Sequence, residues 1–123
     1  MSSRDSVIQF LTGWKPASRT FIDFVPRQKN IEGLKSLGIT MKIARELLQS
    51  ISIENYVSGP ELDRDKGTQD IWVFGLTVGQ AEVYVKIRMY QVQGTAKCKC
   101  LSFHPAERPL SYPFAGRFPK TDQ

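Results

Sequence analysis

Residues 81–92 alternate between apolar side chains and polar or aromatic ones. The odd positions carry Val83, Val85, Ile87 and Met89, and the even positions carry Glu82, Tyr84, Lys86, Arg88 and Tyr90. Successive side chains of a β-strand point to opposite faces of its sheet. The pattern therefore predicts a strand with one face in the core and the other lined by charges and aromatic rings.

Two more strands are expected around this one, at residues 71–77 and 96–103. The links between the three runs are short and contain Gly79 and Gly94, which favours an antiparallel meander. Residues 97, 99, 101 and 103 share one face of the third strand and residues 98, 100, 102 and 104 share the other. Neither face is cleanly polar, so its orientation stays open.

Helical signals precede the strands. Asn30 is a suitable cap for a short helix that ends at Gly38. Thr40 can cap a second helix over residues 41–51, where apolar residues recur every three or four positions. Helices followed by strands predict an α+β fold, with the helices packed on an antiparallel sheet.

The remaining segments complete a single expected domain over residues 1–123. Residues 1–29 contain Gly13, Pro16 and Pro26, and we expect an N-terminal arm there, either extended or a short helix. Residues 58–60 predict a break, and residues 61–67 predict a charged loop. The proline-rich end from Pro105 can pack along the sheet but cannot form a central strand. Residues 115–123 are expected to fray.

The charge balance is basic. There are 17 Lys and Arg against 12 Asp and Glu, which gives a formal charge of +5 and a pI near 9.4. Such a charge favours RNA, DNA, an acidic protein or an anionic membrane surface as partner, although an ordinary solvated surface explains it equally well. No apolar run reaches the roughly 18 residues of a membrane span, and no signal peptide is evident. We therefore expect a cytoplasmic protein.

The polar row of the central strand suits RNA, because cations neutralise phosphate and aromatic faces accept unstacked bases. An ordinary half-exposed strand is the alternative interpretation. The residues expected to bind RNA are Arg88, Tyr90, Lys97, Lys99 and Arg108. His104, the only histidine, lies at the end of the third strand and is a candidate for proton transfer, although a lone histidine is more often structural.

Cys98 and Cys100 are expected to be a reduced, buried pair, because a disulfide across one residue of a strand would be strained. A zinc site formed by these cysteines and His104 is disfavoured, since an extended strand holds them too far apart to share one ion. Nucleotide-binding loops and zinc-protease motifs are missing from the sequence. We expect no metal and no cofactor.

Seven short motifs follow one another between residues 35 and 114: LGIT at 37–40, ENY at 54–56, SGP at 58–60, DIWVFG at 70–75, EVYVKI at 82–87, SFHPAE at 102–107 and YPF at 112–114. In their order and spacing they resemble the MqsR family of bacterial toxins that cleave messenger RNA. The resemblance implies a RelE-like fold, in which helices cover one side of a twisted antiparallel sheet. It also implies the toxin of a type II toxin–antitoxin system, a metal-independent endoribonuclease held inactive by a cognate antitoxin that can also bind DNA.

Four family residues are tied to activity, and two of them do not carry over. The family's tyrosine matches Tyr84, and its C-terminal lysine falls at His104. Its first lysine falls near Ser58, and its glutamine falls at Val73. The chain thus resembles a divergent branch of the family with its own set of site residues.

The resulting hypothesis is cleavage by internal transesterification, with Tyr84, Lys86 and His104 as catalytic residues. Lys86 and Arg88 would stabilise the charge on phosphorus, Tyr84 would position the phosphate or exchange a proton, and His104 would protonate the leaving oxygen. Two alternatives stay open: a non-catalytic RNA-binding regulator, and a protein-interaction module with a basic face.

Overall fold

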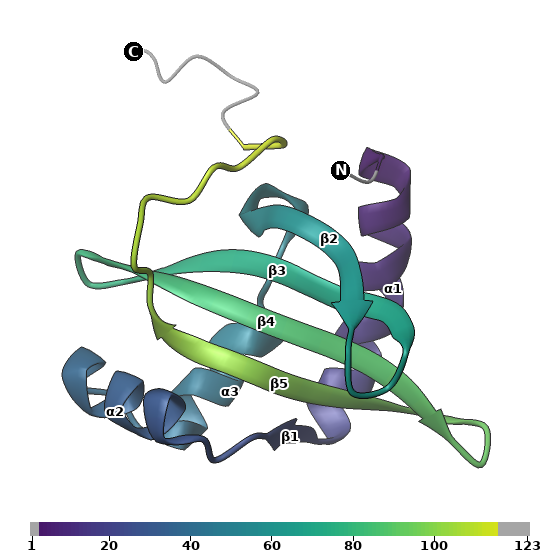
Figure 1. Cartoon of the computed structure of the whole chain (residues 1–123), viewed down its shortest axis with the longest axis horizontal. Helices are drawn as coiled ribbons and strands as arrows, with labels where there is room; N and C mark the ends of the chain where they lie inside the picture. Colours follow the sequence, from purple (N-terminus) through teal and green to yellow (C-terminus); the bar gives the residue numbers. More distant parts are fainter. Residues whose placement is uncertain (1–2, 116–123) are drawn as a thin grey trace.

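The computed structural model describes residues 3–115, and the expected fraying of the C-terminal end concerns residues almost entirely outside this range. The elements, in chain order, are α1 (Arg4–Thr20), β1 (Ile22–Phe24), α2 (Gln28–Leu37), α3 (Met41–Gln49), the short 3-10 helix η1 (Ile53–Asn55), β2 (Tyr56–Asp63), β3 (Thr68–Val78), β4 (Ala81–Val92) and β5 (Thr95–Pro105). Helices come before the main strands, as Figure 1 shows, so the predicted α+β class is confirmed.

The strands form one sheet with the order β1-β5-β4-β3-β2. Strands β2 to β5 are antiparallel neighbours, which confirms the predicted meander of β3, β4 and β5. The sheet is mixed rather than wholly antiparallel, because β1 pairs with β5 in parallel. At three residues, this strand is too short for its alternation to predict it from the sequence. The alternating strand β4 occupies the centre of the sheet.

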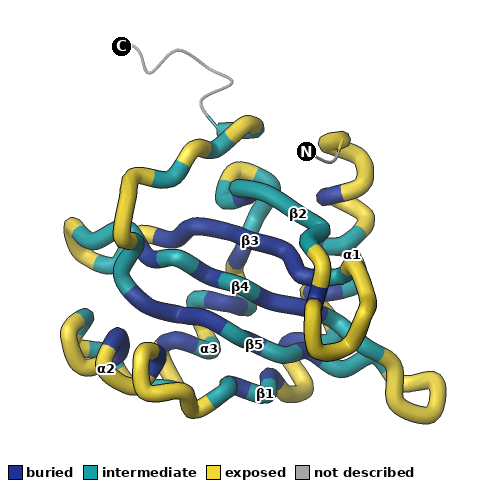
Figure 2. The backbone as a smooth tube through the Cα atoms, viewed as in Figure 1, coloured by how far each residue is buried: buried dark blue, intermediate teal, exposed yellow. Residues whose placement is uncertain are grey.

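Helices α1 and α3 lie behind the sheet in the view of Figure 1, and the core lies between them and the strands. Val83, Val85 and Ile87 of β4 are fully buried, as the alternation predicts. Figure 2 shows the burial concentrated along β3, β4 and β5. The two cysteines are free and buried on this side of the sheet, and burial raises the pKa of the Cys98 thiol to about 11. They are inert core residues, in keeping with the predicted reduced pair.

The N-terminal segment is a 17-residue helix, α1, rather than an extended arm or a short helix. Ser3 caps it by accepting a hydrogen bond from the amide of Ser6 at 3.2 Å. Its buried residues recur at helical spacing, namely Val7, Leu11, Trp14 and Ser18. The indole of Trp14 donates to the carbonyl of Leu48 in α3 at 2.8 Å. The free energy gained from this packing outweighs the destabilising effect of Pro16, a residue type that usually interrupts a helix.

Helix α2 begins at Gln28 with Arg27 as its cap, so the prediction of Asn30 as the cap is wrong. Asn30 is buried within the helix. Its side-chain amide donates to the carbonyl of Leu101 at 3.0 Å, and its oxygen accepts from the amide of Phe103 at 3.0 Å. The side chain thereby continues the hydrogen bonding of β5 beyond the point where β1 ends. The predicted stop at Gly38, which is left-handed with a φ of 70°, is confirmed.

Helix α3 has the predicted cap, since the hydroxyl of Thr40 accepts from the amide of Ile43 at 3.2 Å. The expected break at residues 58–60 and charged loop at 61–67 are corrected in part. Strand β2 runs through the first of these segments into the second, and only residues 64–67 form the turn. Register shifts between β2 and β3 explain why no alternating pattern marks this strand.

The segment after β5 leaves the edge of the sheet and crosses toward β2, as Figure 1 shows. Phe114 stacks on Tyr56 of β2, with ring centroids 5.4 Å apart. The tail therefore packs along the sheet without joining it as a strand, as its prolines predict. Within residues 3–115, no helix has the length and apolar character needed to cross a membrane.

Candidate functional site

A β-bulge in β5 decides which of its residues share a face with Tyr84. Lys86 is opposite Ser102, whereas the next residue, Ile87, is opposite Cys100, so Leu101 is an extra residue in β5. The side-chain alternation of β5 therefore changes phase at this point. We call the face of the sheet that points away from α1 and α3 the open face; it carries the even residues of β4. Ser102 and His104 lie on this open face, beside Lys86 and Tyr84. N-terminal to the bulge, the residues of β5 on the open face are the odd-numbered ones, Lys97 and Lys99.

The bulge also separates the three residues considered for zinc. The cysteines lie in the core, and His104 lies on the open face of the sheet. Among the described residues, no group of three His, Cys, Asp or Glu side chains is placed to hold a metal ion.

Tyr84 and His104 form a stacked pair across β4 and β5. Their ring centroids are 5.5 Å apart, with an angle of 26° between the planes. His104 is 7% exposed. Its Nδ1 lies 3.0 Å from the carbonyl oxygen of Pro105, and because that oxygen can only accept, Nδ1 is the donor. Nε2 is therefore the ring nitrogen left to exchange a proton with a substrate.

Lys86 adds a cation beside this pair. Its Nζ lies 5.9 Å from the centre of the Tyr84 ring. In the part of the chain that the structure describes, no carboxylate oxygen lies within 4.0 Å of this amine. Lys86 also borders two depressions of the open face, each lined by both cations and carboxylates. One of them brings Lys86 together with Arg27, Lys66 and Lys99 and with Asp63 and Asp65. The amine is thus available to a phosphate.

Arg88 lies on the same face but is engaged within the fold. It is 7% exposed, and its guanidinium donates to Asp70 at 2.8 Å and lies 3.8 Å from Asp63. Burial raises the pKa of Asp70, but the hydrogen bond and the charge of Arg88 outweigh it and lower that pKa below its usual value. The predicted contact of Arg88 with RNA would require a phosphate to displace a carboxylate, so the placement favours a structural role.

The other predicted RNA contacts are spread along the open face and its edge. Tyr90 lies beside Arg88, with the guanidinium carbon 5.2 Å from its ring centre, and Lys97 is opposite Tyr90 in β5. The Nζ of Lys99 lies 4.0 Å from a carboxylate oxygen of Asp23. Arg108 is exposed, near the Tyr84–His104 pair. The structure therefore gathers Tyr84, Lys86 and His104, with Arg108 beside them, and leaves Lys97 and Tyr90 near the far end of β4.

Glu61 of β2 is a site residue that the sequence did not indicate. Burial raises the pKa of the Tyr84 hydroxyl, and the negative charge of Glu61 raises it further. Tyr84 consequently remains neutral and can donate a hydrogen bond. Glu61 borders a depression together with Lys86, and its carboxylate accepts from the hydroxyl of Ser58 at 3.0 Å. Glu61 is not recognisable as a site residue in the sequence, because the charged residues 61–67 resemble a solvent-exposed loop.

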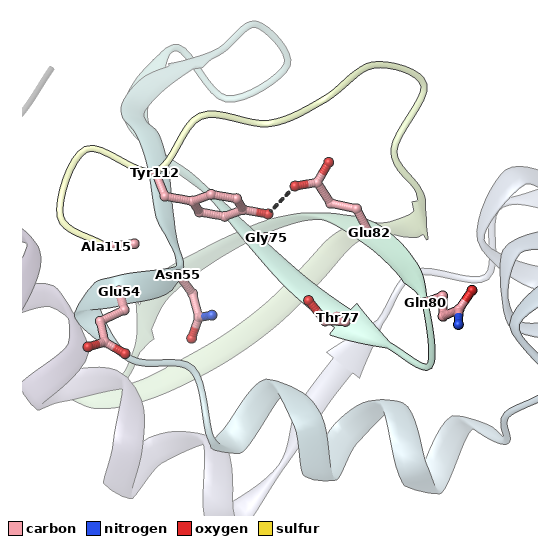
Figure 3. Close-up of a pocket in the computed structure, with 8 residues that line it drawn as sticks. All are labelled: Glu54, Asn55, Gly75, Thr77, Gln80, Glu82, Tyr112 and Ala115. Carbon is pink, nitrogen blue, oxygen red and sulfur yellow. Dashed lines mark hydrogen bonds between the residues drawn. The ribbon is translucent and has the colours of Figure 1, made fainter. Parts of the chain in front are cut away.

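The C-terminal segment forms a wall beside the site and is fixed by Glu82. The carboxylate of Glu82 accepts from the hydroxyl of Tyr112 at 2.6 Å and from the amide of Leu110 at 3.0 Å. Figure 3 shows Tyr112 reaching over β3 toward Glu82. The Tyr112 ring lies against Gly75, where any side chain would collide with it. Burial and the Glu82 carboxylate raise the pKa of Tyr112, so the phenol stays protonated in this bond.

Two pockets flank this wall. The one drawn in Figure 3 has a volume of about 300 Å³ and is lined by Glu54, Asn55, Gly75, Thr77, Gln80, Glu82, Tyr112 and Ala115. The other has a volume of about 290 Å³ and is lined by Tyr84, His104, Glu107, Arg108, Pro109 and Leu110. Only the second contains predicted site residues, so it is the one joined to the candidate site.

Comparisons of the chain with protein-family models, with curated proteins and with solved structures found no match.

Proposed function

We propose that this chain is an endoribonuclease that cleaves messenger RNA, and that it acts as the toxin of a type II toxin–antitoxin system, as its resemblance to the MqsR family implies. The observation that carries the proposal is the Tyr84–His104 pair, which is stacked at 5.5 Å on the open face of the sheet. Beside it lies the amine of Lys86, which has no ion pair among residues 3–115. A proton donor, a hydrogen-bond donor and a cation thus converge where a phosphate can lie.

The proposed reaction is internal transesterification. The ribose 2′-oxygen attacks the adjacent phosphorus, and the bond from phosphorus to the 5′-oxygen breaks. The products are a 2′,3′-cyclic phosphate and a free 5′-hydroxyl. The 2′-hydroxyl must lose a proton, the extra charge at phosphorus must be stabilised, and the 5′-oxygen must gain a proton.

The site offers a group for each of these tasks. Nε2 of a protonated His104 gives its proton to the leaving 5′-oxygen, because Nδ1 is held by the Pro105 carbonyl. Lys86 supplies the positive charge near the phosphate, and the neutral hydroxyl of Tyr84 donates a hydrogen bond to it. The carboxylate of Glu61, whose charge reaches Tyr84, is the candidate acceptor for the 2′-hydroxyl proton.

RNA would be held along the open face on both sides of this centre. Lys99 and Lys97 extend the positive charge along β5, Tyr90 offers a ring, and Arg108 flanks the other side. Such contacts make RNA affinity fall with rising salt concentration. The proposed setting is the cytoplasm, where messenger RNA is translated and a cognate antitoxin would hold the protein inactive.

Induced expression in bacteria tests the proposal. The wild type should arrest growth and create new 5′-hydroxyl ends in cellular RNA. His104→Ala should slow cleavage by about 10²- to 10⁴-fold, and Lys86→Ala by about 10²- to 10³-fold, because each removes one group that acts on the transition state. Lys15→Ala is the matched control, since it removes an exposed lysine of α1 on the opposite face of the sheet.

The outcomes separate the alternatives. Arrest and new ends that both substitutions relieve, with Lys15→Ala acting as the wild type does, support the nuclease. RNA binding by the soluble protein without new ends would instead indicate a regulator. Neither binding nor cleavage would indicate a protein-interaction module.

A further inference from the structure

The pocket beside the Tyr84–His104 pair has a composition that suits a flat ligand with a polar edge. It is lined by the two aromatic rings, by the apolar residues Pro109 and Leu110, and by the exposed polar residues Glu107 and Arg108. Unpaired RNA bases bind in this way, stacked on rings or arginine planes and hydrogen-bonded along their edges. The volume of about 290 Å³ is at the lower end for small-ligand pockets, which limits the occupant to a small ring system.

The outer wall of this pocket is held in place before any ligand arrives. The backbone of Ala106 donates to the carbonyl of Glu82 at 2.8 Å, and Leu110 and Tyr112 are fixed by the Glu82 carboxylate. On the α2 side, Lys29 forms an ion pair with Glu107 at 2.6 Å. A pocket built in advance loses little conformational freedom on binding, and this favours affinity and selectivity.

The pocket is next to the proposed chemistry, because His104 belongs to both. A base in the pocket would therefore belong to a nucleotide adjacent to the bond that breaks. We infer that this pocket, formed by Tyr84, His104 and residues 107–110, binds one unpaired nucleobase next to the cleaved phosphate and sets the sequence preference of cleavage. This inference rests on the proposed function and adds to it the residues that select the substrate.

The test compares Leu110→Trp, which fills the pocket, with Leu110→Ala, which removes part of its apolar side. Ile43→Trp is the matched control, because it places the same indole on the exposed face of α3, away from the site. Each purified protein digests an RNA oligonucleotide pool of random sequence, and the bases around the new ends are counted. A parallel titration of the four ribonucleoside 3′-monophosphates, followed by NMR, measures binding in the pocket without cleavage.

The expected result is a base preference at one position next to the cut in the wild type and in Ile43→Trp. Leu110→Trp should weaken binding of the preferred monophosphate by about 5- to 150-fold, the range for loss of one stacked base, and should reduce the preference accordingly. Leu110→Ala should weaken both by less.

The outcomes separate the base-binding pocket from the nuclease activity. Cleavage by Leu110→Trp at the wild-type rate and with the wild-type preference overturns the base pocket and leaves the nuclease standing. No cleavage by the wild type, together with monophosphate binding that Leu110→Trp abolishes, overturns the nuclease and retains the pocket. Absence of both activities overturns both.

Discussion

At Gly33, helix α2 approaches β5 so closely that there is no room for a side chain. A Cβ atom there would lie 2.8 Å from the Cβ of His104 and 2.9 Å from the carbonyl oxygen of Phe103. The backbone of the helix therefore rests directly on the part of β5 that carries the candidate proton donor. A glycine inside a helix gives no such signal in the sequence, so its connection to the site emerges only from the structure.

Gly33→Ala should destabilise the protein by about 1–3 kcal/mol, because the added methyl group forces α2 away from β5, even though alanine favours the helix by about 1 kcal/mol. Gly13→Ala is the matched control. Gly13 also lies within a helix, but a Cβ there would lie at an ordinary contact distance of 3.5 Å from the side chain of Met89. The Gly13→Ala variant should therefore be at least as stable as the wild type. Urea unfolding of both variants decides the matter. A Gly33→Ala variant as stable as Gly13→Ala would contradict this view of the contact.

Asn30 shows a second limit of inference from local sequence. As a residue type it predicts a helix cap, but tertiary contacts place it in the helix interior with its side chain bonded to Leu101 and Phe103. The helix cap is a local preference of about 1 kcal/mol. Hydrogen bonding to the backbone of Leu101 and Phe103 contributes more to stability than a cap, because each buried backbone group left without a partner costs about 1–3 kcal/mol.

At the scale of elements, Arg88 joins three strands. It extends from β4 to Asp70 of β3 and Asp63 of β2, and Asp63 also accepts hydrogen bonds from the amides of Asp65 and Lys66 in the turn. The ion-pair cluster thus fixes the hairpin of β2 and β3 over the open face. Glu61 lies on this hairpin, so the cluster also holds the candidate base.

Arg88→Met should lower the free energy of unfolding at pH 7 by about 3 kcal/mol, since it leaves the buried carboxylate of Asp63 and the half-buried carboxylate of Asp70 without their cation. Because the folded pKa of Asp70 is lowered, its contribution to stability is present above the unfolded pKa of about 3.9 and is lost as pH falls through the folded value. The difference between wild type and variant should therefore shrink below about pH 4.

Lys86→Met is the control for this measurement, because it changes a cation on the same strand and face that has no ion pair among the described residues. Its stability should stay within about 0.5 kcal/mol of the wild type. Equal losses of stability in the two methionine variants, or a difference that does not shrink as the pH falls below about 4, would contradict the proposed role of the Arg88 cluster.

The elements that sequence predicts well are those with a complete local signal. Strand β4 combines strict alternation with a glycine turn at its end, and α3 combines a threonine cap with a regular apolar period. Strand β2 is not predicted and the length of helix α1 is underestimated, because their signals are contradictory: β2 has bulges and charges, and α1 contains Gly13 and Pro16. The bulge at Leu101 is invisible in the sequence, yet it decides that His104 lies beside Tyr84.

At the scale of the whole molecule, the net charge of +5 predicts a polyanionic partner but not the surface that meets it. The fold divides the cations into two groups. Arg88 and Lys29 are used in ion pairs within the protein, whereas Lys86 and Arg108 border the open face and the base pocket without a carboxylate in contact among residues 3–115. The sequence alone suggests that basic and aromatic residues form the site, and the pairing of β4 with β5 brings Tyr84 and His104 together.

In the proposed reaction, the RNA supplies its own nucleophile, the 2′-hydroxyl next to the broken bond. The most direct test incubates the purified wild type with an RNA oligonucleotide that contains one strong cleavage position, and with the same oligonucleotide carrying a single 2′-deoxyribose there. We expect cleavage of the first to a 2′,3′-cyclic phosphate and a 5′-hydroxyl, and no cleavage of the second at that position. Equal cleavage of both oligonucleotides, or products that carry a 5′-phosphate, would contradict the mechanism.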